Sequence, residues 1–259
     1  MLEGANIKLS SVASNVLGKS GRAMIEAMIA GETDPDTLSE LAKRKLKSKK
    51  ADLKRALNGL EGPHQKLMLS AQLRHIDYLD EEVSRLDAEI KTRMLPFEED
   101  LELLDTIPGV ARRTAETIAA EIGLNMDQYP SAAHLCSWAG LCPGQNESAG
   151  KRISGKTRKG NKKLRSTLVE AAKATARTKG TYLSSQYHRI AARRGANRAT
   201  VAVAHSILSM TYYILKRKQP YIELGPTYYE ERKRDVIIKQ SIRKLESLGV
   251  AITIDATAS

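Results

Sequence analysis

The stretch Leu103-Leu-Asp-Thr-Ile-Pro-Gly-Val-Ala-Arg-Arg-Thr-Ala-Glu-Thr-Ile-Ala-Ala-Glu-Ile-Gly123 predicts two helices joined by a tight turn. Pro108 and Gly109 break the first helix, because proline cannot continue a helix and glycine readily adopts turn conformations. The second helix restarts near Ala111, and its predicted buried face consists of Ala115, Ile118, Ala119 and Ile122. The pattern resembles a helix-hairpin-helix, in which turn amides and a helix N-terminus hold a phosphate without reading the base.

The expected phosphate contacts of this hairpin are Gly109, Ala111, Arg112, Arg113 and Thr114. Ala111 stands where a second turn glycine is usual, so one amide is expected to approach its phosphate less closely. The same pattern also fits a hairpin that only packs its domain together. The residues alone leave both interpretations open.

Helical spacing recurs outward from this hairpin, so the expected fold class is mainly α. Small amphipathic helices are predicted in residues 1–60, and further helices at 131–139, 162–177 and 201–215. A long helix is predicted from Gly62-Pro63 to Pro96. Its apolar residues recur at spacings of three and four: Leu69, Leu73, Ile76, Leu79, Val83, Leu86 and Ile90. This coiled-coil spacing fits a dimer contact or an intramolecular hairpin seam equally well.

Three parts are expected along the chain. Residues 1–100 form a helical linker with a coiled-coil hairpin, and residues 101–218 form a helical domain that contains the helix-hairpin-helix. Residues 219–259 form a C-terminal tail with a short strand at 250–254. The basic run Lys43 to Arg55 is interpreted as a solvated helix face rather than as a specific binding patch.

Charge points to a polyanionic partner. The 259 residues carry a net charge of +12, which favours nucleic acid. No apolar run has the length of a membrane span, and no signal peptide is recognised, so a cytoplasmic, nucleoid-associated protein without a membrane partner is expected. Cys136 and Cys142 lack the spacing of a zinc site and are expected to be reduced thiols. The aromatic content of 4% disfavours a fold that binds single strands mainly by stacking.

The positive charge is concentrated after Ser148. Between residues 151 and 198 the sequence holds fifteen cations against one carboxylate, Glu170. The predicted nucleic-acid contacts of the loop and the helix that follows it are Lys151, Arg152, Lys156, Arg158, Lys159, Lys162, Lys163 and Arg165. Glycines and hydroxyls in the 141–160 loop would let its backbone approach a strand closely.

Ser148 is the candidate nucleophile of this loop. A serine hydroxyl needs a base, a metal or a dense positive field to attack phosphorus. No histidine lies near Ser148 in the sequence, and Gly-x-Ser-x-Gly is absent, so hydrolase-type triads have little support. The surrounding cations suit phosphoryl transfer. In most basic loops, however, a serine only donates a hydrogen bond to phosphate, and the residues alone leave both roles open.

A family resemblance follows from several separated motifs. These are Ile107-Pro108-Gly109, Ala139-Gly140-Leu141-x-Pro143, Glu147-Ser148 and Gly160-Asn161-x-x-Leu164-Arg165. Together they resemble the C-terminal transposase domain of the insertion sequence 110 family of bacterial mobile-element recombinases. The resemblance extends to Asn6-Ile-Lys-Leu9, to Gly31-Glu-Thr-Asp-Pro35 and to the Pro220 to Leu248 tail, and so it covers essentially the whole chain.

The resemblance implies DNA binding, DNA recombination and transposition. It matches Ser148 to the catalytic serine of the family, which forms a covalent 5′-phosphoserine bond with DNA while a structured RNA from the element guides pairing. Family members begin with a RuvC-like nuclease domain whose four acidic residues bind metal, and this chain starts at what looks like the linker helix after it. Mg²⁺ is therefore expected only with that domain, and no cofactor is expected within this chain.

The expectation from the resemblance is a truncated transposase or a fragment that binds DNA or guide RNA but does not recombine DNA alone. The coiled coil is expected to mediate a homo-oligomer. The alternative from another class is a non-catalytic helix-hairpin-helix nucleic-acid-binding protein in which Ser148 is only a contact. A weaker third alternative is a basic coiled-coil scaffold.

Overall fold

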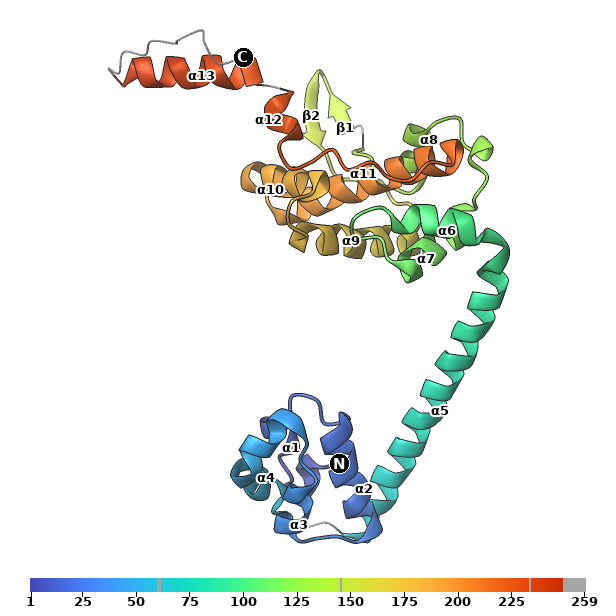
Figure 1. Ribbon diagram of the computed structural model, residues 1–259, viewed down its shortest axis with the longest axis vertical. Coiled ribbons are helices and arrows are strands. Elements are labelled where there is room, and N and C mark those ends of the chain that lie inside the picture. The colour runs from blue at the N-terminus through green and yellow to red at the C-terminus, as the bar shows by residue number, and fades with distance from the viewer. Residues whose placement is uncertain (60–61, 145, 233, 249–259) are drawn as a thin grey trace. The chain divides into compact units, whose positions relative to one another are not determined.

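Helices dominate the computed structural model, which confirms the predicted fold class (Figure 1). The structure describes residues 1–59, 62–144, 146–232 and 234–248. The chain divides into two compact units, residues 1–93 and 94–259, and each unit is treated by itself. The strand expected at 250–254 lies outside the described residues.

The N-terminal unit contains short helices and the greater part of one long helix. Its elements are η1 Glu3–Ala5, α1 Leu9–Val12, α2 Lys19–Ala30, α3 Pro35–Glu40, η2 Arg44–Lys49, α4 Lys50–Leu57 and α5 Pro63–Met94. Asp34 caps α3, because its carboxylate accepts hydrogen bonds from the backbone N–H groups of Asp36 and Thr37. The core of the unit gathers Ile7, Leu9, Met24, Met28, Leu38 and Leu53, each at most 2% exposed.

The predicted long helix is confirmed as α5, but its apolar residues divide into two groups. Leu69 and Leu73 are buried in the core of the N-terminal unit, so they are not free to form an oligomer contact. Arg22 of α2 reinforces this packing with two 2.7 Å contacts to the carboxylate of Asp77, whose pKa the guanidinium lowers. Further along α5 the exposed fractions of Leu79, Val83 and Leu86 are 47%, 54% and 58%.

The basic run 43–55 differs from its predicted form as one helix face. Arg44 has φ 53°, a left-handed conformation that an α-helix does not admit. The run folds as two elements, the 3₁₀ helix η2 and the α-helix α4, which begins only at Lys50.

The C-terminal unit is a helical bundle with one small sheet. It contains η3 Leu95–Phe97, α6 Glu98–Asp105, α7 Arg112–Ile122, η4 Met126–Gln128, α8 Ala132–Trp138, β1 Asn146–Ser148, β2 Lys151–Ser154, α9 Lys162–Arg177, α10 Tyr182–Arg194, α11 Ala196–Arg217, α12 Tyr228–Glu231 and α13 Arg234–Ser247. Helix α11 packs against α8, α9 and α10 (Figure 1). Its core residues Val203, Ala204, Ile207 and Leu208 have no exposed surface, as the apolar pattern predicts.

Helix α9 matches its predicted range 162–177. Its buried face consists of Leu164, Leu168, Ala171, Ala172 and Thr175. The hydroxyl of Thr175 donates to the carbonyl of Pro108 at 2.6 Å and ties the α6–α7 turn to α9. The helix that follows the 141–160 loop is thus anchored in the core of its unit.

The segment after α11 is fastened to α10. The carboxylate of Glu223 accepts a hydrogen bond from the backbone N–H of Tyr182 at 2.7 Å. The ring of Tyr229 stacks on that of Tyr182 with centroids 5.1 Å apart, and the guanidinium of Arg189 lies 4.4 Å from the Tyr229 centroid. Burial raises the pKa of Tyr229, so its hydroxyl stays protonated and donates to Tyr182.

Cys136 and Cys142 are free thiols in the structure. Burial raises the pKa of Cys136 to about 11 and raises that of Cys142, which keeps both thiols protonated at neutral pH. Within the described ranges, no three His, Cys, Asp or Glu side chains are grouped to hold a metal ion. Nor does any described helix combine the length and apolarity that a membrane span needs.

Candidate nucleic-acid interface

The 141–160 loop is a two-stranded ribbon whose ends meet at two glycines. A Cβ atom at Gly140 would lie 2.8 Å from the backbone nitrogen of Gly160, and one at Gly160 would lie 2.4 Å from the nitrogen of Gly140. Only glycine permits this approach of two backbones. The close approach of Gly140 and Gly160 is the neck of the ribbon. Beyond the neck, Pro143 pairs with Thr157, and the N–H of Gly144 donates to the carbonyl of Lys156 at 2.9 Å.

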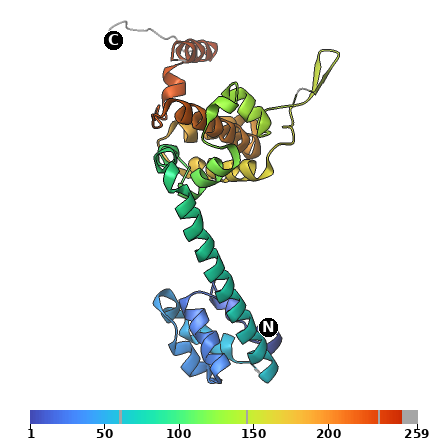
Figure 2. The ribbon, with the colours of Figure 1, turned by 90° about the vertical axis from the view of Figure 1, so that its right-hand side faces the viewer.

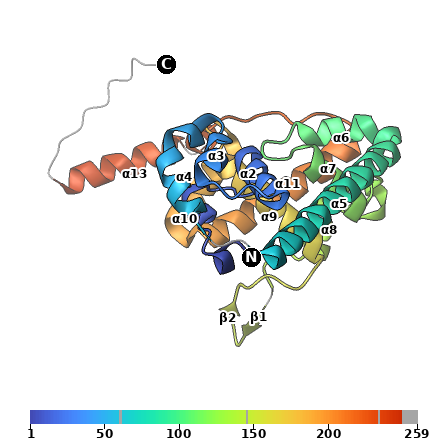
Figure 3. The same cartoon turned by 90° about the horizontal axis from the view of Figure 1, so that it is seen from below.

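A β-hairpin forms the outer end of this ribbon. Strands β1 and β2 are antiparallel, with Ser148 opposite Lys151 and Glu147 opposite Arg152. The turn residues Ala149 and Gly150 have φ values of 49° and 73°, as a two-residue type I′ turn requires. Figures 2 and 3 both show the hairpin extending away from the helices of its unit.

The hairpin was not predicted from the sequence, which indicates only a polar loop there. Its strands span three and four residues, too few for an alternating pattern to stand out. The Ser-Ala-Gly-Lys stretch at 148–151 is a weak turn signal, because alanine rarely adopts positive φ. The irregular register between Asn146 and Glu147 interrupts the alternation further.

Ser148 is exposed at the end of β1, next to the turn. A directly opposed pair of an antiparallel ladder shares one face, which places the side chain of the exposed Lys151 on the same face as that of Ser148. Ile153 of β2 is 66% exposed and adds an apolar surface to this polar hairpin. The backbone of Arg152 is described, but its side chain lies outside the described residues. Ser148 is thus open to a large polyanionic ligand.

The other predicted loop cations fall into two groups. Lys156, Arg158, Lys159 and Lys162 are exposed and make no ion pair within the part of the chain that the structure describes. They can neutralise phosphates without first breaking a contact. Arg165 instead donates through Nη1 to the carbonyl of Gly140 at 3.0 Å. Nζ of Lys163 lies 3.6 Å from the carboxylate of Glu121, and the side chain is 73% exposed. Lys163 can therefore pair with Glu121 and also contact a phosphate.

Asn161 secures the ribbon at the start of α9. Its Oδ1 accepts hydrogen bonds from the N–H groups of Lys163 and Leu164 at 3.1 and 3.0 Å, which is an N-cap. Its Nδ2 donates to the carboxylate of Glu121 on α7 at 2.6 Å. One side chain therefore caps α9 and joins it to α7 directly below the neck.

Asn161→Ala is expected to destabilise the protein by about 2 kcal/mol, because both the cap and the bond to Glu121 are lost. Asn161→Ser keeps a capping oxygen but has no group that reaches Glu121, so it should lose roughly half as much. Urea denaturation followed by circular dichroism measures both. Equal stability of the alanine and serine variants would show that the Oδ1 cap contributes nothing.

The α6–α7 turn of the predicted helix-hairpin-helix is packed against α9. Gly109 has φ 86°, and a Cβ atom there would lie 2.1 Å from Oγ1 of Thr175. Ala111 is exposed at the N-cap of α7 and provides no side-chain cap. The guanidinium of Arg112 is held by Glu98 and by Glu116, which raises its pKa.

The remaining predicted contacts of this hairpin differ in their exposure. Thr114 is half-buried on α7, whereas Arg113 is exposed there. The carbonyl of Arg113 accepts a hydrogen bond from Thr117, one turn later. Packing against α9 thus accounts for Gly109, and ion pairing accounts for Arg112. Phosphate binding by the turn amides remains a prediction.

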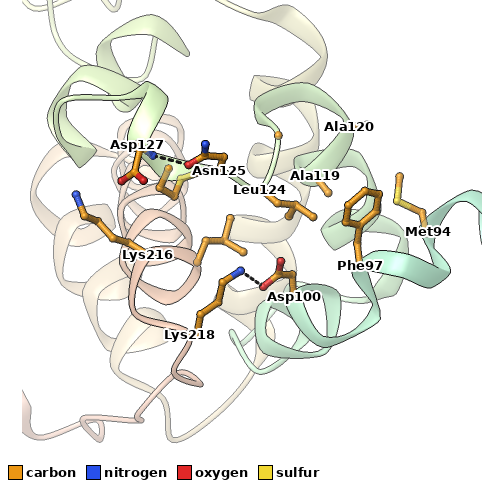
Figure 4. Close-up of a pocket in the computed structure, with 13 residues that line it drawn as sticks. Met94, Phe97, Asp100, Ala119, Ala120, Leu124, Asn125, Asp127, Lys216 and Lys218 are labelled. Carbon is orange, nitrogen blue, oxygen red and sulfur yellow. Dashed lines mark hydrogen bonds and ion pairs between the residues drawn. The ribbon is translucent and has the colours of Figure 1, made fainter.

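A separate cavity of about 690 Å³ lies in the C-terminal unit (Figure 4). Met94 and Phe97 form one wall, and Lys216 and Asp127 lie on the opposite side. Lys218 pairs with Asp100 at its edge. Among the described residues of the 141–160 ribbon, none lines this cavity, so it is distinct from the interface around Ser148.

The segment that contains the ribbon is similar to known proteins. Residues 101–189 match the family model "Transposase IS116/IS110/IS902 family". The match runs from α6 into α10 and includes Ser148. It relates this chain to insertion-sequence transposases.

Two relatives agree with the family match. Over 163 residues, 61% of this chain, the sequence is 29% identical to "Transposase for insertion sequence element IS1111A" of Coxiella burnetii (strain RSA 493 / Nine Mile phase I), covering 44% of that protein. Over 112 residues, 43% of this chain, it is 31% identical to "Transposase for insertion sequence element IS1328" of Yersinia enterocolitica, covering 33% of it. The matched parts thus span less than half the length of each relative.

Proposed function

We propose that this chain binds DNA and supplies the serine nucleophile of an insertion-sequence transposase. The observation that carries the proposal is the placement of Ser148: an exposed hydroxyl at the end of a projecting hairpin, beside Lys151, within the segment that matches the transposase family. The free cations Lys156, Arg158 and Lys159 lie on the same ribbon and would bind the phosphates that flank the reacting one.

The proposed step is an in-line displacement at a DNA phosphodiester. Oγ of Ser148 forms a bond to phosphorus and gives up its proton, while the bond from phosphorus to the 3′ oxygen breaks and that oxygen takes up a proton. The product is a 5′-phosphoserine and a free 3′ hydroxyl. The bond between serine and phosphate conserves the energy of the broken phosphodiester, which is then available to rejoin a strand. Lys151 would stabilise the charge that grows on the non-bridging oxygens in the transition state.

The described residues around Ser148 do not fit a Mg²⁺ site. Glu147 is the one carboxylate adjacent to the serine, and the exposed cations of the loop around it repel a divalent metal ion, whereas a Mg²⁺ site is built from oxygen ligands in octahedral geometry. The proposed chemistry therefore assigns metal binding to the acidic residues of a RuvC-like nuclease domain. The step assigned to this chain uses the serine hydroxyl and the cations beside it.

The proposal includes two further partners, a structured guide RNA and a second copy of the chain. Leu79, Val83 and Leu86 recur at spacings of three and four on the exposed part of α5 and would form the contact between copies. Leu69 and Leu73 are excluded from that contact, because they belong to the core of the N-terminal unit.

A test of the proposed function uses duplex DNA with a radioactive phosphorus at the cleavage site of the element end. The chain is mixed with Mg²⁺ and with the separately produced nuclease domain of a transposase that contains one. We expect a labelled, protease-sensitive adduct on a denaturing gel, and mass spectrometry should assign the phosphate to the peptide that contains Ser148. An adduct attached elsewhere would overturn the assignment of the nucleophile. An adduct formed without the nuclease domain would contradict its proposed requirement.

A further inference from the structure

A second concentration of positive charge lies in the N-terminal unit, where it lines a cavity of about 1020 Å³. The lining residues are Val12, Ser14, Asn15, Gly18, Lys19, Ser20, Lys43, Arg44, Lys45, Leu46 and Lys49. Five of them are cations and none is a carboxylate. The sequence interpretation of the 43–55 run as a solvated helix face does not account for this arrangement.

The two sides of the cavity come from separate segments that the fold joins. Ser20, at the start of α2, is 5% exposed, and its hydroxyl accepts a hydrogen bond from the backbone N–H of Lys43 at 2.8 Å. Gly21 fixes the turn before α2, because a Cβ atom there would lie 2.1 Å from the carbonyl oxygen of Val16. The cations are therefore held around one space, unlike those of a mobile tail.

Three acidic residues nearby in the sequence are bound to other cations. Lys50 pairs with Glu40, Lys54 pairs with Asp36, and Arg55 pairs with Asp52. Within the described residues, no ion pair involves the cavity cations Lys19, Lys43, Arg44, Lys45 or Lys49, all of which are exposed. Their charges add in a concave surface, where the potential is focused.

Backbone groups add to this potential. Helix α2 starts at the cavity edge with Gly18 as its N-cap, and no side chain caps it. The N–H groups at a helix start carry partial positive charge, and an anion is the ligand that satisfies them. Val12 and Leu46 are half-buried lining residues and offer an apolar surface to the sugar beside a phosphate.

We propose that this cavity binds the phosphodiester backbone of a nucleic-acid strand. It would be a second phosphate site, separate in the chain from the ribbon that carries Ser148. The inference rests on the proposed function in one respect only: the choice of nucleic acid as the polyanion. Because exposed cations at a strand contact phosphates, which carry no sequence information, the binding should not depend on base sequence.

The test compares two triple variants of the full chain that change the net charge equally. Lys43→Ala/Lys45→Ala/Lys49→Ala removes three cavity lysines. Lys47→Ala/Lys66→Ala/Lys91→Ala removes three lysines of the same unit that do not line the cavity. Fluorescence anisotropy with random-sequence duplex DNA and, separately, duplex RNA, each of about 30 base pairs, measures Kd from low to moderate salt. Circular dichroism checks that both variants are folded.

The cavity variant should bind at least one duplex about tenfold more weakly at low salt, and the slope of log K against log salt should fall by about two to three. The matched control should stay within about twofold of the unsubstituted chain. Whether the cavity variant loses affinity for DNA, for RNA or for both shows which nucleic acid supplies the phosphates. Equal behaviour of the two triple variants overturns the proposal.

A third variant, Lys156→Ala/Arg158→Ala/Lys159→Ala, separates this inference from the proposed function. If only the ribbon variant loses binding, the cavity site is wrong and the proposed function stands. If only the cavity variant loses binding, the cavity site stands and the ribbon is not the DNA interface. If both lose binding, both proposals are supported.

Discussion

Ser148→Ala is expected to form no covalent protein–DNA adduct under the conditions in which the unsubstituted chain forms one. The substitution removes the atom that is proposed to bond to phosphorus, so the loss in rate should be at least about a thousandfold. Ser148 is exposed, and an exposed serine-to-alanine change should alter the free energy of unfolding by no more than about 0.5 kcal/mol. Its Kd for DNA and the salt dependence of that Kd should stay almost unchanged.

Ser166→Ala is the matched control for this prediction. Ser166 is an exposed serine of α9 in the same unit, and its loss should leave adduct formation intact. Gel separation of labelled adducts and anisotropy with unlabelled competitor DNA distinguish chemistry from binding. An active Ser148→Ala variant would remove the serine from the mechanism. A variant that fails to bind DNA would instead make Ser148 a binding contact.

The helical scaffold follows from the sequence because its apolar residues recur at helical spacing. Helix α9 spans its predicted range, 162–177, and helical spacing predicts the inner face that is buried in the structure: Leu164, Leu168, Ala171, Ala172 and Thr175. The long helix α5 also follows from its pattern, with Pro63 at its start and Pro96 just beyond its end. The burial of Leu69 and Leu73, in contrast to Leu79, depends on their place in the core of the N-terminal unit, which spacing cannot reveal.

The residues of the site could be predicted from the sequence, but their arrangement in space could not. The cations and Ser148 stand out in the sequence, but the hairpin depends on the left-handed conformation of Ala149 and on pairing between limbs of an irregular ribbon. Arg165 illustrates the limit: it is predicted as a phosphate contact, and in the structure it donates to the carbonyl of Gly140. A charged residue gives no sign in the sequence of which partner the fold supplies.

The N-terminal cavity shows the same limit at longer range. Lys19 and Lys43 are separated by most of α2 and α3, and the hydrogen bond from the N–H of Lys43 to Ser20 brings their segments together. A basic run alone indicates a solvated surface. The positive φ of Arg44, at the start of η2, is likewise not indicated by a basic run.

Gly160→Ala is expected to have the largest effect on stability of any single substitution at the ribbon. The added Cβ would lie 2.4 Å from the carbonyl carbon of Ala139 and 2.4 Å from the backbone nitrogen of Gly140. These are backbone atoms on the far side of the neck, so no side-chain rotation relieves the clash. We expect a loss of about 3 kcal/mol in the free energy of unfolding, because the neck must open.

Opening the neck should also change the surroundings of Trp138, the single tryptophan of the chain, which precedes Ala139 at the end of α8. Its fluorescence emission therefore reports on the neck in the folded protein, while urea denaturation measures the free energy. Gly180→Ala is the control: its positive φ of 75° imposes strain, but a Cβ there has nothing within 4 Å, so about 1 kcal/mol is expected. If Gly160→Ala costs no more than Gly180→Ala and leaves the Trp138 emission unchanged, the close approach of residues 140 and 160 does not hold the ribbon. If the expected loss is found, the position of Ser148 depends on two glycines that take no part in its chemistry.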